Sequence, residues 1–555
     1  MTAQVEARRI TGPHLLGDRT GAALDVRLGP DDDALPARWE AAARALLHEV
    51  GWPDETTAVR RFPGGANLFV SAPPDSLHAA TDLAELAWAG IEDAGAADGI
   101  PRLMEAIDRE RNPALLALAA EAERRGLTFL HDDDGVSVGS GTGVLCWPGE
   151  AIPPADGVDW NAVHDIPTGL VTGSNGKTTT VRLAAAMVRE AGGTPGFTST
   201  DGVAVGRELI APTDYAGPMG ARLALRDRRV TTAVLETARG GILRRGLAVR
   251  RADAALVTNI AEDHFGDFGI QDISSLLEAK LVVTRVVRRN GAVILNADDP
   301  LLRERGTALG RPVTWFSRSG VPGTAGARSL VLEGNALVLS SDAARRRLGT
   351  LDDVAAATGG TTRYNIENAL GAAALALALG VDPDMIGPAL RNFDPAEDNP
   401  GRGTLLNVGG VRVLVDYGHN PHGLAALGEM ADGIPASRRL VLLGQAGDRE
   451  DAAIHALAEA ALDLRPERVI LKEMGEYLRG RQPGEVRRLL RESLVRGGLP
   501  KDAIEDADLE IDAVRRALEW ARPGDLLILL VHEHRADVLE LLRSAGARRD
   551  RLAPA

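Results

Sequence analysis

A glycine-rich run between an apolar segment and a helical segment is the part of this sequence best suited to binding phosphate. The run reads VTGSNGKTT over residues 171–179, after an expected strand at Thr168–Thr172 and before an expected helix at Thr178–Ala191. Backbone N–H groups of such a loop point at a bound anion, Lys177 can reach the outer phosphates, and Thr178 can offer a hydroxyl to Mg²⁺. The usual phosphate-loop pattern has glycine at the first position of the run, so a plain strand–turn–helix corner with an exposed lysine is the alternative. The expected phosphate contacts are Gly173, Ser174, Asn175, Gly176, Lys177, Thr178 and Thr179.

Polar residues also follow two later apolar runs of strand length. Glu236 ends the run Thr232–Glu236, and His264 comes shortly after the run Ala254–Ile260. Ligands of open α/β sheets bind at the carboxyl ends of the strands, so both side chains could hold Mg²⁺ there. Taken alone, Glu236 could equally be a helix cap or a surface acid, and His264 a structural histidine. Their parallel positions beyond successive strands favour a metal site.

Two further segments follow these residues along the chain. Lys280 lies on an expected helix at Leu276–Arg289, where a solvated lysine and a functional one are both compatible with the sequence. The segment NADDP at 296–300 follows an expected strand at Gly291–Asn296. We interpret it first as a turn and a helix start, and only second as a source of ligands.

The later part of the chain holds an asparagine and an arginine that could contact a nucleotide. Asn365 stands at the start of an expected helix at Asn365–Leu379, where a simple N-cap is the alternative to a ligand contact. Arg402 lies in the glycine-rich stretch 400–403, where a surface arginine in a hinge is the alternative.

A hexapeptide after another expected strand is the second strong signal. The sequence DYGHNP at 416–421 follows the expected strand Val411–Tyr417. Asp416 at a strand end would mean little by itself. The complete hexapeptide, far downstream of the glycine-rich loop, is hard to obtain by chance.

The pattern of elements divides the chain into three regions. We expect an α+β N-terminal domain over residues 1–160, a central phosphate-loop domain with a mostly parallel sheet over 161–395, and a Rossmann-like C-terminal α/β domain over 396–555. The segment Gly149–Gly157 is typical of a linker, and Arg548–Ala555 is expected to fray. Expected N-terminal elements are a strand near Ala23–Leu28 and helices at Ala37–Val50, Leu77–Ala94 and Asn112–Gly126; further C-terminal strands are Arg439–Gly444, Arg468–Glu473 and Asp525–His532.

Composition limits the classes of partner. The net charge of −15 argues against broad binding to nucleic acid or anionic membranes, while permitting a local basic pocket. The one cysteine, Cys146, excludes an intrachain disulfide and a cysteine metal cluster, and its apolar neighbours predict that it is buried. The sequence has neither an N-terminal apolar signal segment nor an apolar stretch long enough to span a membrane, so we expect a cytoplasmic protein.

The motifs together resemble those of the Mur ligases and their relatives, the folylpolyglutamate synthetases. The matching segments are TGSNGKTT at 172–179, NIAEDH at 259–264 and DYGHNP at 416–421, in which Gly418 replaces the family's alanine. The resemblance implies an ATP- and Mg²⁺-dependent ligase that joins a carboxylate to an amine through an acyl phosphate. It implies catalytic roles for Lys177, His264, Lys280, Arg402 and Asp416, nucleotide contacts from the glycine-rich loop, Asn365, Arg402, Asp416 and His419, and metal binding by Thr178, Glu236 and His264. In several Mur ligases a lysine placed like Lys280 is carbamylated and binds metal.

Further segments are similar to the Mur-like half of the cyanophycin synthetase family. The segment ETARGGILRRGL at 236–247 closely resembles that family's ETARGGILRxG, and EDHFG at 262–266 and YLRGR at 477–481 are also similar. Residues 161–540 carry the resemblance well and residues 1–160 only loosely. That family has an ATP-grasp domain between these two parts, where this chain has a short linker, so we do not expect a full polymerase cycle from this chain alone.

The resemblance leaves the substrates open. It implies a small-molecule or peptide carboxylate and an amino acid or dipeptide amine as partners, and a homo-oligomer is compatible with the sequence. One alternative is a Mur-type or folylpolyglutamate-type ligase with another acid substrate. A second is an inactive nucleotide-binding scaffold, and a third, which the C-terminal hexapeptide disfavours, is an NTPase that drives motion.

Overall fold

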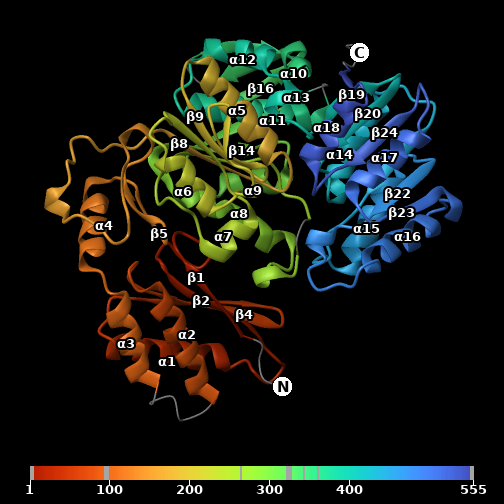
Figure 1. Ribbon diagram of the computed structural model, residues 1–555. Coiled ribbons are helices and arrows are strands. Elements are labelled where there is room, and N and C mark those ends of the chain that lie inside the picture. Colours follow the sequence, from red (N-terminus) through yellow and green to blue (C-terminus); the bar gives the residue numbers. More distant parts are fainter. Residues whose placement is uncertain are drawn as a thin grey trace. The chain divides into compact units, whose positions relative to one another are not determined.

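The computed structural model of this protein describes residues 5–92, 99–262, 265–320, 328–341, 344–358 and 362–550. Figure 1 shows the course of the chain and the labels of its helices and strands. Contacts between residues divide the chain into two compact units. The first contains the residues up to Ile260 together with Phe265–Trp315 and Gly371–Asp382, and the second contains Phe316–Leu370 and the chain from Pro383 onward.

The N-terminal region of the first unit is an antiparallel sheet covered by helices. Its strand order is β1-β2-β4-β3, and helices α1 and α2 pack on the sheet (Figure 1). Trp39, Leu68 and Leu83 are fully buried between the helices and the strands. This α+β arrangement is the one expected from the sequence, although β1, β3, β4 and α3 were not predicted. The elements are β1 (Val5–Ile10), β2 (Gly21–Arg27), α1 (Leu35–Glu49), β3 (Thr57–Phe62), β4 (Gly65–Ser71), α2 (Leu77–Glu92) and α3 (Ile100–Glu110).

A second, smaller sheet of order β5-β6-β7 follows, with helix α4 (Pro113–Arg125) beside it. Its strands are β5 (Phe129–Asp132), β6 (Gly135–Val138) and β7 (Leu145–Trp147). The prediction that Cys146 is buried is wrong, since this thiol is exposed. Successive side chains of a strand point to opposite faces, so Cys146 points away from the core cluster that Leu145 and Trp147 pack against.

Arginine side chains connect the N-terminal region to the rest of the first unit by donating to main-chain oxygens. Arg60 donates to the carbonyl of Gly269 at 3.1 Å, Arg285 to that of His14 at 3.1 Å, and Arg250 to that of Asp18 at 2.7 Å. Arg8 donates in the same way to the carbonyl of Leu243. Hydrogen bonds from a charged donor are stronger than neutral ones, so these contacts help to hold the region in register.

The larger sheet of the first unit has the order β11-β10-β9-β12-β8-β13-β14-β15, and its core strands β9, β12, β8, β13 and β14 are parallel. Every residue of β8 is buried, as a strand covered by helices on both faces requires. The expected helix at Leu276–Arg289 extends too far, because Val287 already pairs with Ala252 in the sheet. The strands are β8 (Thr168–Thr172), β9 (Pro195–Ser199), β10 (Gly202–Val205), β11 (Glu208–Ala211), β12 (Thr232–Glu236), β13 (Ala252–Val257), β14 (Val287–Asn296) and β15 (Val313–Ser317), and the helices are α5 (Lys177–Glu190), α6 (Pro218–Arg226), α7 (Arg239–Arg245), α8 (Ile273–Arg285) and α9 (Pro300–Thr307).

The second unit begins with an antiparallel ribbon and continues with short helices. Strand β17 (Ala336–Ser340) pairs with β16 (Ser329–Glu333) on one side and with β18 (Arg345–Thr350) on the other. The following helices are α10 (Leu351–Thr358), α11 (Arg363–Ala378), α12 (Ile386–Asn392) and α13 (Pro395–Asp398).

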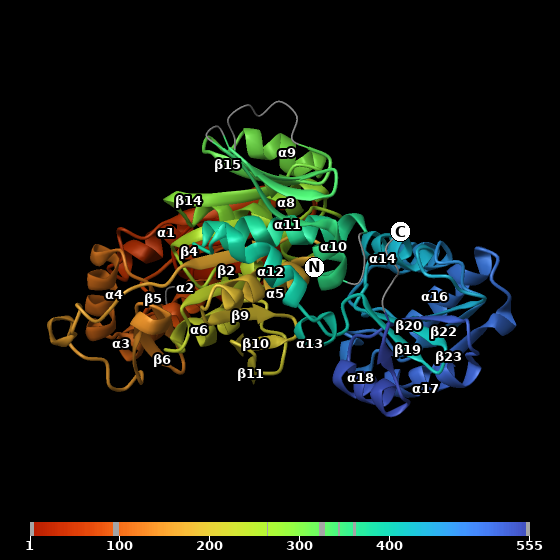
Figure 2. The ribbon, with the colours of Figure 1, turned by 90° about the horizontal axis from the view of Figure 1, so that it is seen from above.

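The C-terminal sheet of the second unit has the order β23-β22-β21-β24-β20-β19-β25, with parallel pairing from β23 to β20. One core cluster lies under α14, α15 and α16 and another under α17 and α18, so the sheet is covered on both faces (Figure 2). This confirms the expected doubly wound α/β arrangement. Arg548–Arg549 do not fray, because they pair with β19, while residues 551–555 lie outside the described residues. The elements are β19 (Thr404–Val408), β20 (Val411–Asp416), α14 (Pro421–Asp432), β21 (Arg439–Leu443), α15 (Asp451–Leu462), β22 (Arg468–Lys472), α16 (Glu485–Arg496), β23 (Ile504–Ala507), α17 (Glu510–Trp520), β24 (Leu526–Leu530), α18 (Arg535–Ser544) and β25 (Arg548–Arg549).

Candidate nucleotide and metal site

The glycine-rich loop connects the buried strand β8 to helix α5, as predicted. Gly173 has a φ of +144°, and a Cβ atom there would lie 1.9 Å from Thr258 Oγ1. Gly176 has a φ of +82° at the position before the helix. Both conformations favour glycine, so the backbone geometry explains the two glycines without reference to a ligand.

Residues that follow strand β13 hold the loop in place. The N–H groups of Ser174 and Asn175 donate to the main-chain and side-chain oxygens of Asn259, each at 2.9 Å. The Thr258 hydroxyl donates to the carbonyl of Asn175 at 2.6 Å. Asp299, which caps helix α9, also accepts the N–H of Ile260 at 2.7 Å. The NADDP segment is therefore a turn and a helix start, as predicted, and it also supports the neighbouring strand end.

Two lysines lie against the loop. Lys177 Nζ donates to the carbonyls of Gly173 at 3.1 Å and Ser174 at 3.0 Å. Lys280 Nζ donates to the same Gly173 carbonyl at 2.7 Å, and Lys280 is only 2% exposed. The alternative of a solvated helix lysine is therefore wrong for Lys280. Two ammonium groups within hydrogen-bond reach of one carbonyl make this loop strongly attractive to an anion.

A hydroxyl and a carboxylate meet directly beside the loop. Thr178 Oγ1 donates to Glu236 Oε2 at 2.8 Å and lies 3.3 Å from the hydroxyl of Thr200. Glu236 is 1% exposed and lies at the end of strand β12, so it is not a surface acid, and Ala238 is the N-cap residue of α7. Buried oxygen donors of this kind fit Mg²⁺, which takes few protein ligands and keeps several waters.

His264 lies outside the described residues, so its predicted role in metal binding stays a prediction. Within the described ranges, no group of three or more His, Cys, Asp or Glu residues gathers as a metal site. The residues that fit a magnesium ion in the described part of the first unit are Thr178 and Glu236.

The second unit places the hexapeptide residues around the end of strand β20. The carboxylate of Asp416 accepts the N–H groups of Gly403 and Gly418, each at 2.7 Å. The guanidinium carbon of Arg402 lies 4.1 Å from the centre of the Tyr417 ring. Burial raises the pKa of Asp416, although the Arg402 charge and the backbone N–H groups oppose this shift. Asp416 thus holds the segment that carries Arg402 against the end of the sheet.

Aromatic rings and a cap complete this part of the second unit. The Tyr417 ring makes edge contacts with His419, at 5.5 Å, and with His532, at 4.9 Å between ring centres. The side chain of Asn420 caps helix α14 by accepting the N–H of Gly423 at 2.8 Å. Burial lowers the pKa of His532 well below its usual range, with a further contribution from Lys472.

A buried ion pair beneath these rings was not predicted from the sequence. Lys472, the last residue of β22, pairs with Glu510, and both side chains are fully buried. Glu510 also accepts the main-chain N–H groups of His532, Glu533 and His534. An apolar strand ending in lysine was visible in the sequence, but nothing local indicated its partner.

Asn365 does not cap helix α11, because the helix begins two residues earlier at Arg363. Asn365 is 4% exposed and is thus a buried side chain of the first helical turn. Its predicted nucleotide contact stays a prediction.

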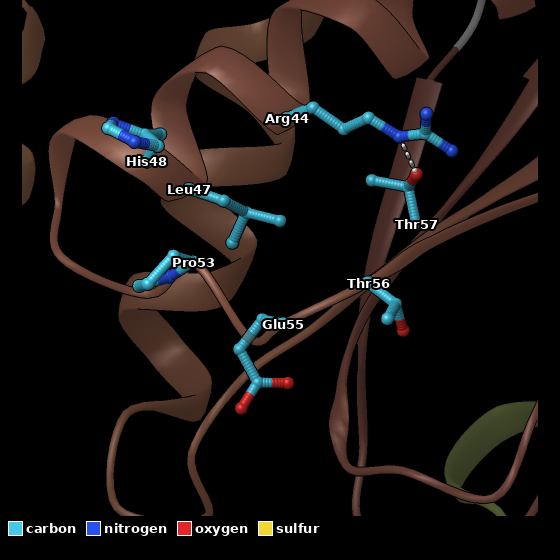
Figure 3. Close-up of a pocket in the computed structure, with 7 residues that line it drawn as sticks. All are labelled: Arg44, Leu47, His48, Pro53, Glu55, Thr56 and Thr57. Atoms are coloured by element: carbon cyan, nitrogen blue, oxygen red, sulfur yellow. Dashed lines mark hydrogen bonds between the residues drawn. The ribbon is translucent and has the colours of Figure 1, made fainter.

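One cavity lies away from every predicted site residue. It has a volume of about 370 Å³ and lies between helix α1 and the start of strand β3 (Figure 3). Arg44 donates to Thr57 at 3.0 Å across one side of it. Its lining residues are Arg44, Leu47, His48, Pro53, Glu55, Thr56 and Thr57.

Two family models match this chain. The Mur ligase middle domain matches residues 171–376, and the glutamate ligase domain of Mur ligases matches residues 401–530. In the described residues, no helix is long and apolar enough to cross a membrane.

Curated relatives match over about two thirds of the chain. A cyanophycin synthetase of Crocosphaera subtropica is 35% identical over 378 residues, which are 66% of this chain and 42% of that protein. The chain therefore matches less than half the length of this relative. A UDP-N-acetylmuramoyl-L-alanyl-D-glutamate–2,6-diaminopimelate ligase of Geobacter metallireducens is 26% identical over 67% of this chain and 75% of that protein.

Solved structures share the fold. E. coli FolC in complex with ADP has a TM-score of 0.50 and 19% identity, over 68% of this chain and 90% of that chain. At this identity the likeness concerns the fold alone.

Proposed function

We propose, from the premise that this chain belongs to the Mur ligase family, that it is an ATP-dependent ligase joining a carboxylate to an amine. The observation that carries the proposal is the meeting of three groups at one sheet edge. These are the glycine-rich loop, the Lys177 ammonium above it and the buried Thr178–Glu236 pair beside it. Together they fit the phosphates and the metal ion of a nucleotide.

The loop's own residues would bind the phosphates of ATP. Backbone N–H groups at the start of helix α5 and the Lys177 ammonium would face the anion. Phosphate is a stronger acceptor than the two carbonyls that Lys177 now contacts, so a modest rotation of its side chain would transfer these hydrogen bonds to the nucleotide. Lys280, held on the Gly173 carbonyl, would add positive charge without leaving its buried position.

Thr178 and Glu236 would hold Mg²⁺, and His264 is proposed as a ligand of a second ion. Bound Mg²⁺ would neutralise charge on the phosphoryl oxygens and on the substrate carboxylate. For Mg²⁺ to bind, the Glu236 carboxylate has to give up the hydrogen bond that it accepts from Thr178 and contact the metal instead. The hydroxyl oxygen of Thr178 is then available as a second ligand. The family resemblance also makes Lys280 a candidate for carbamylation. That change would replace its positive charge by a negative carboxylate, so it is the alternative to the role of Lys280 as an ammonium on the Gly173 carbonyl.

The reaction that suits these groups is carboxylate activation. The substrate carboxylate would attack the γ-phosphate of ATP to give an acyl phosphate and ADP, and an amine would then displace phosphate to form an amide. A carboxylate is a poor acyl donor, and phosphorylation supplies a leaving group. Lys177 would stabilise the charge that develops on the transferred phosphoryl group.

Residues of the second unit are carried over from the family as candidates for nucleotide binding. Arg402, stacked on Tyr417, would contact a phosphate, and Asp416 would fix the segment that carries Arg402 and could also bind the ribose. His419 and Asn365 are proposed as additional nucleotide contacts.

The similarity to cyanophycin synthetases supports an amino acid or a dipeptide as the amine. Because the match covers 42% of the first of these relatives, the substrates and the activity of the whole protein are proposals. A Mur-type or folylpolyglutamate-type ligase with another acid, and an inactive nucleotide-binding scaffold, are the competing functions.

Release of ADP and phosphate by the purified chain with ATP and Mg²⁺ tests the proposal. The amines are arginine, lysine and β-aspartyl-arginine, and the acids are aspartate, glutamate and short aspartyl peptides, assayed singly and in pairs. Release that requires both an acid and an amine, with an amide product by mass spectrometry, supports a ligase. ATP binding with no pair-dependent release contradicts the ligase and favours the scaffold.

A further inference from the structure

The segment Phe265–Gln271, which leads into helix α8, has a backbone conformation that its own sequence does not favour. Phe268 has a φ of +52° and a ψ of +30°, a left-handed conformation that is uncommon for a residue with a bulky side chain. Residues in such conformations persist where contacts with other elements impose them, and they cluster at functional sites. The contacts of this segment therefore show what imposes its conformation.

The hairpin of strands β3 and β4 in the N-terminal region contacts the segment directly. Arg60 donates to the carbonyl of Gly269 at 3.1 Å, and the Gln271 side chain donates to the carbonyl of Pro63 at 2.7 Å. A Cβ atom at Gly269 would lie 2.3 Å from the Phe62 ring, so the hairpin and the segment touch at this point. Arg60 and Gly269 are 209 positions apart, so only the folded chain brings them together.

Arg60 is itself held by a polar network on the N-terminal sheet. It donates to the side-chain oxygen of Asn67 at 3.2 Å, and Asn67 in turn donates to Asp25 at 2.6 Å. Asn67 is 1% exposed and lies on β4, while Asp25 lies on β2. Two strands behind the guanidinium therefore fix the donor that reaches Gly269.

The same segment is attached to groups of the proposed metal site. Asp267 forms an ion pair with Arg239 at 2.9 Å, and the Arg239 side chain is 8% exposed. Arg239 is the first residue of helix α7 and follows shortly after Glu236, the last residue of β12. In the sequence, the segment directly follows His264. A movement of the segment would thus be transmitted to Glu236 through Arg239 and to His264 through the chain.

We propose that Arg60 is a positioning residue for metal binding, because by holding Gly269 it fixes the segment that supports the proposed ligands Glu236 and His264. The inference rests on the proposed function and makes the N-terminal hairpin part of the support of that site. Arg60 acts through the segment rather than on the nucleotide. Its loss should therefore weaken metal binding more than nucleotide binding.

Mn²⁺ binding to the full chain, followed by electron paramagnetic resonance in the presence of β,γ-imido-ATP, tests this role without turnover. Arg60→Gln should bind Mn²⁺ on the order of tenfold more weakly, the loss typical of groups that orient metal ligands. In the same variant, amide hydrogen exchange of the chain without metal should be faster over residues 265–271. Its affinity for the nucleotide alone should change little.

Arg61→Gln is the matched control. Arg61 is the next residue of β3, its side chain points to the opposite face of the sheet, and it donates to the carbonyl of Asp33 at 2.7 Å. This variant should bind Mn²⁺ like the wild type. Arg60→Lys and Gln271→Ala each remove only part of the contact, so they should give smaller losses and replace Arg60→Gln if it does not fold.

Wild-type Mn²⁺ affinity in Arg60→Gln would overturn the positioning role, and so would an equal loss in Arg61→Gln. Equal losses of metal and nucleotide affinity would also overturn it, since they would assign Arg60 to the stability of the fold. Weak Mn²⁺ binding in His264→Gln but not in Arg60→Gln would refute this inference and leave the proposed metal site intact. Mn²⁺ binding that depends on Arg60, without ADP release from any acid–amine pair, would support the inference and contradict only the ligase.

Discussion

Replacement of Gly173 by alanine should abolish tight nucleotide binding, because the structure has no room for a methyl group at this position. The added Cβ would lie 1.9 Å from Thr258 Oγ1, and the φ of +144° disfavours any L side chain. Backbone strain of this kind costs about 1–3 kcal/mol. Moving Thr258 aside would also break its bond to the carbonyl of Asn175, which costs about 1 kcal/mol more.

The backbone strain and the lost hydrogen bond together cost about 2–4 kcal/mol. This cost arises in the loop that is proposed to bind ATP. If the loop relieves the strain by leaving its binding conformation, the affinity for Mg-ATP falls by about 30- to 1,000-fold. Isothermal titration calorimetry measures this loss, and thermal unfolding shows whether the chain still folds.

Gly192→Ala is the matched control, since Gly192 also has a positive φ, of +82°, but no atom lies within 4 Å of its added Cβ. It should cost some stability and leave ATP affinity unchanged. Thr258→Ala removes the atom in closest contact, so the double variant G173A/T258A should lose less than the sum of the two single losses. Wild-type ATP affinity in G173A, or strictly additive losses in the double variant, would refute the steric reasoning.

Three further predictions follow from other parts of the structure. Lys177→Ala should lower the rate of ADP release by about 10³, equal to about 4 kcal/mol of barrier, and a wild-type rate in a steady-state assay would contradict the proposed reaction. The pKa of His14 falls from 6.5 to about 3, mainly through burial, so the folded chain binds fewer protons between these values. The free energy of unfolding should therefore decrease as pH falls from 6.5 towards 3 and should not depend on this group above pH 6.5. Denaturant titrations at several pH values should show a shallower decrease for His14→Gln than for the wild type. An equal decrease in both proteins would exclude His14 as the cause of the pH dependence. Glu510→Gln should destabilise the second unit by about 3–5 kcal/mol, because Lys472 would stay buried with its charge uncompensated, and the double variant K472M/E510Q should recover much of that loss in chemical unfolding.

The sequence predicted best those strands that are buried on both faces of a sheet. Strands such as β8 and β12 are covered on both faces, so their apolar runs stand out in the sequence. The glycine-rich loop was equally visible, because a tight turn that requires glycines is followed directly by a lysine and a threonine suited to phosphate and Mg²⁺.

The N-terminal strands could not be predicted for the opposite reason. Strands β1 and β3 carry adjacent arginines, which give them a polar sequence without clear alternation. Their charges are accommodated by distant groups, since Arg8 pairs with Asp25 and Arg60 reaches Gly269. No local pattern contains that information.

The candidate site also contains residues that the sequence predicted and contacts that it could not predict. Lys177, Thr178 and Glu236 were assigned from motif and strand-end position, and the structure brings all three together. The burial of Lys280 and the support from Asn259 depend on packing between elements distant in sequence. The residues around Lys280 do not determine which face of its helix is covered, so the sequence alone allows both a solvated and a functional lysine.

The arginine contacts that join the N-terminal region to the rest of the first unit have an evolutionary consequence. Their acceptors are main-chain carbonyls, as with Arg60 on Gly269, Arg285 on His14 and Arg250 on Asp18. Every amino acid supplies the same carbonyl, so these hydrogen bonds restrict the identity of the arginines and not that of the accepting residues. Related chains should therefore keep the arginines without correlated changes at the acceptors, and a search for co-varying residue pairs would overlook this interface.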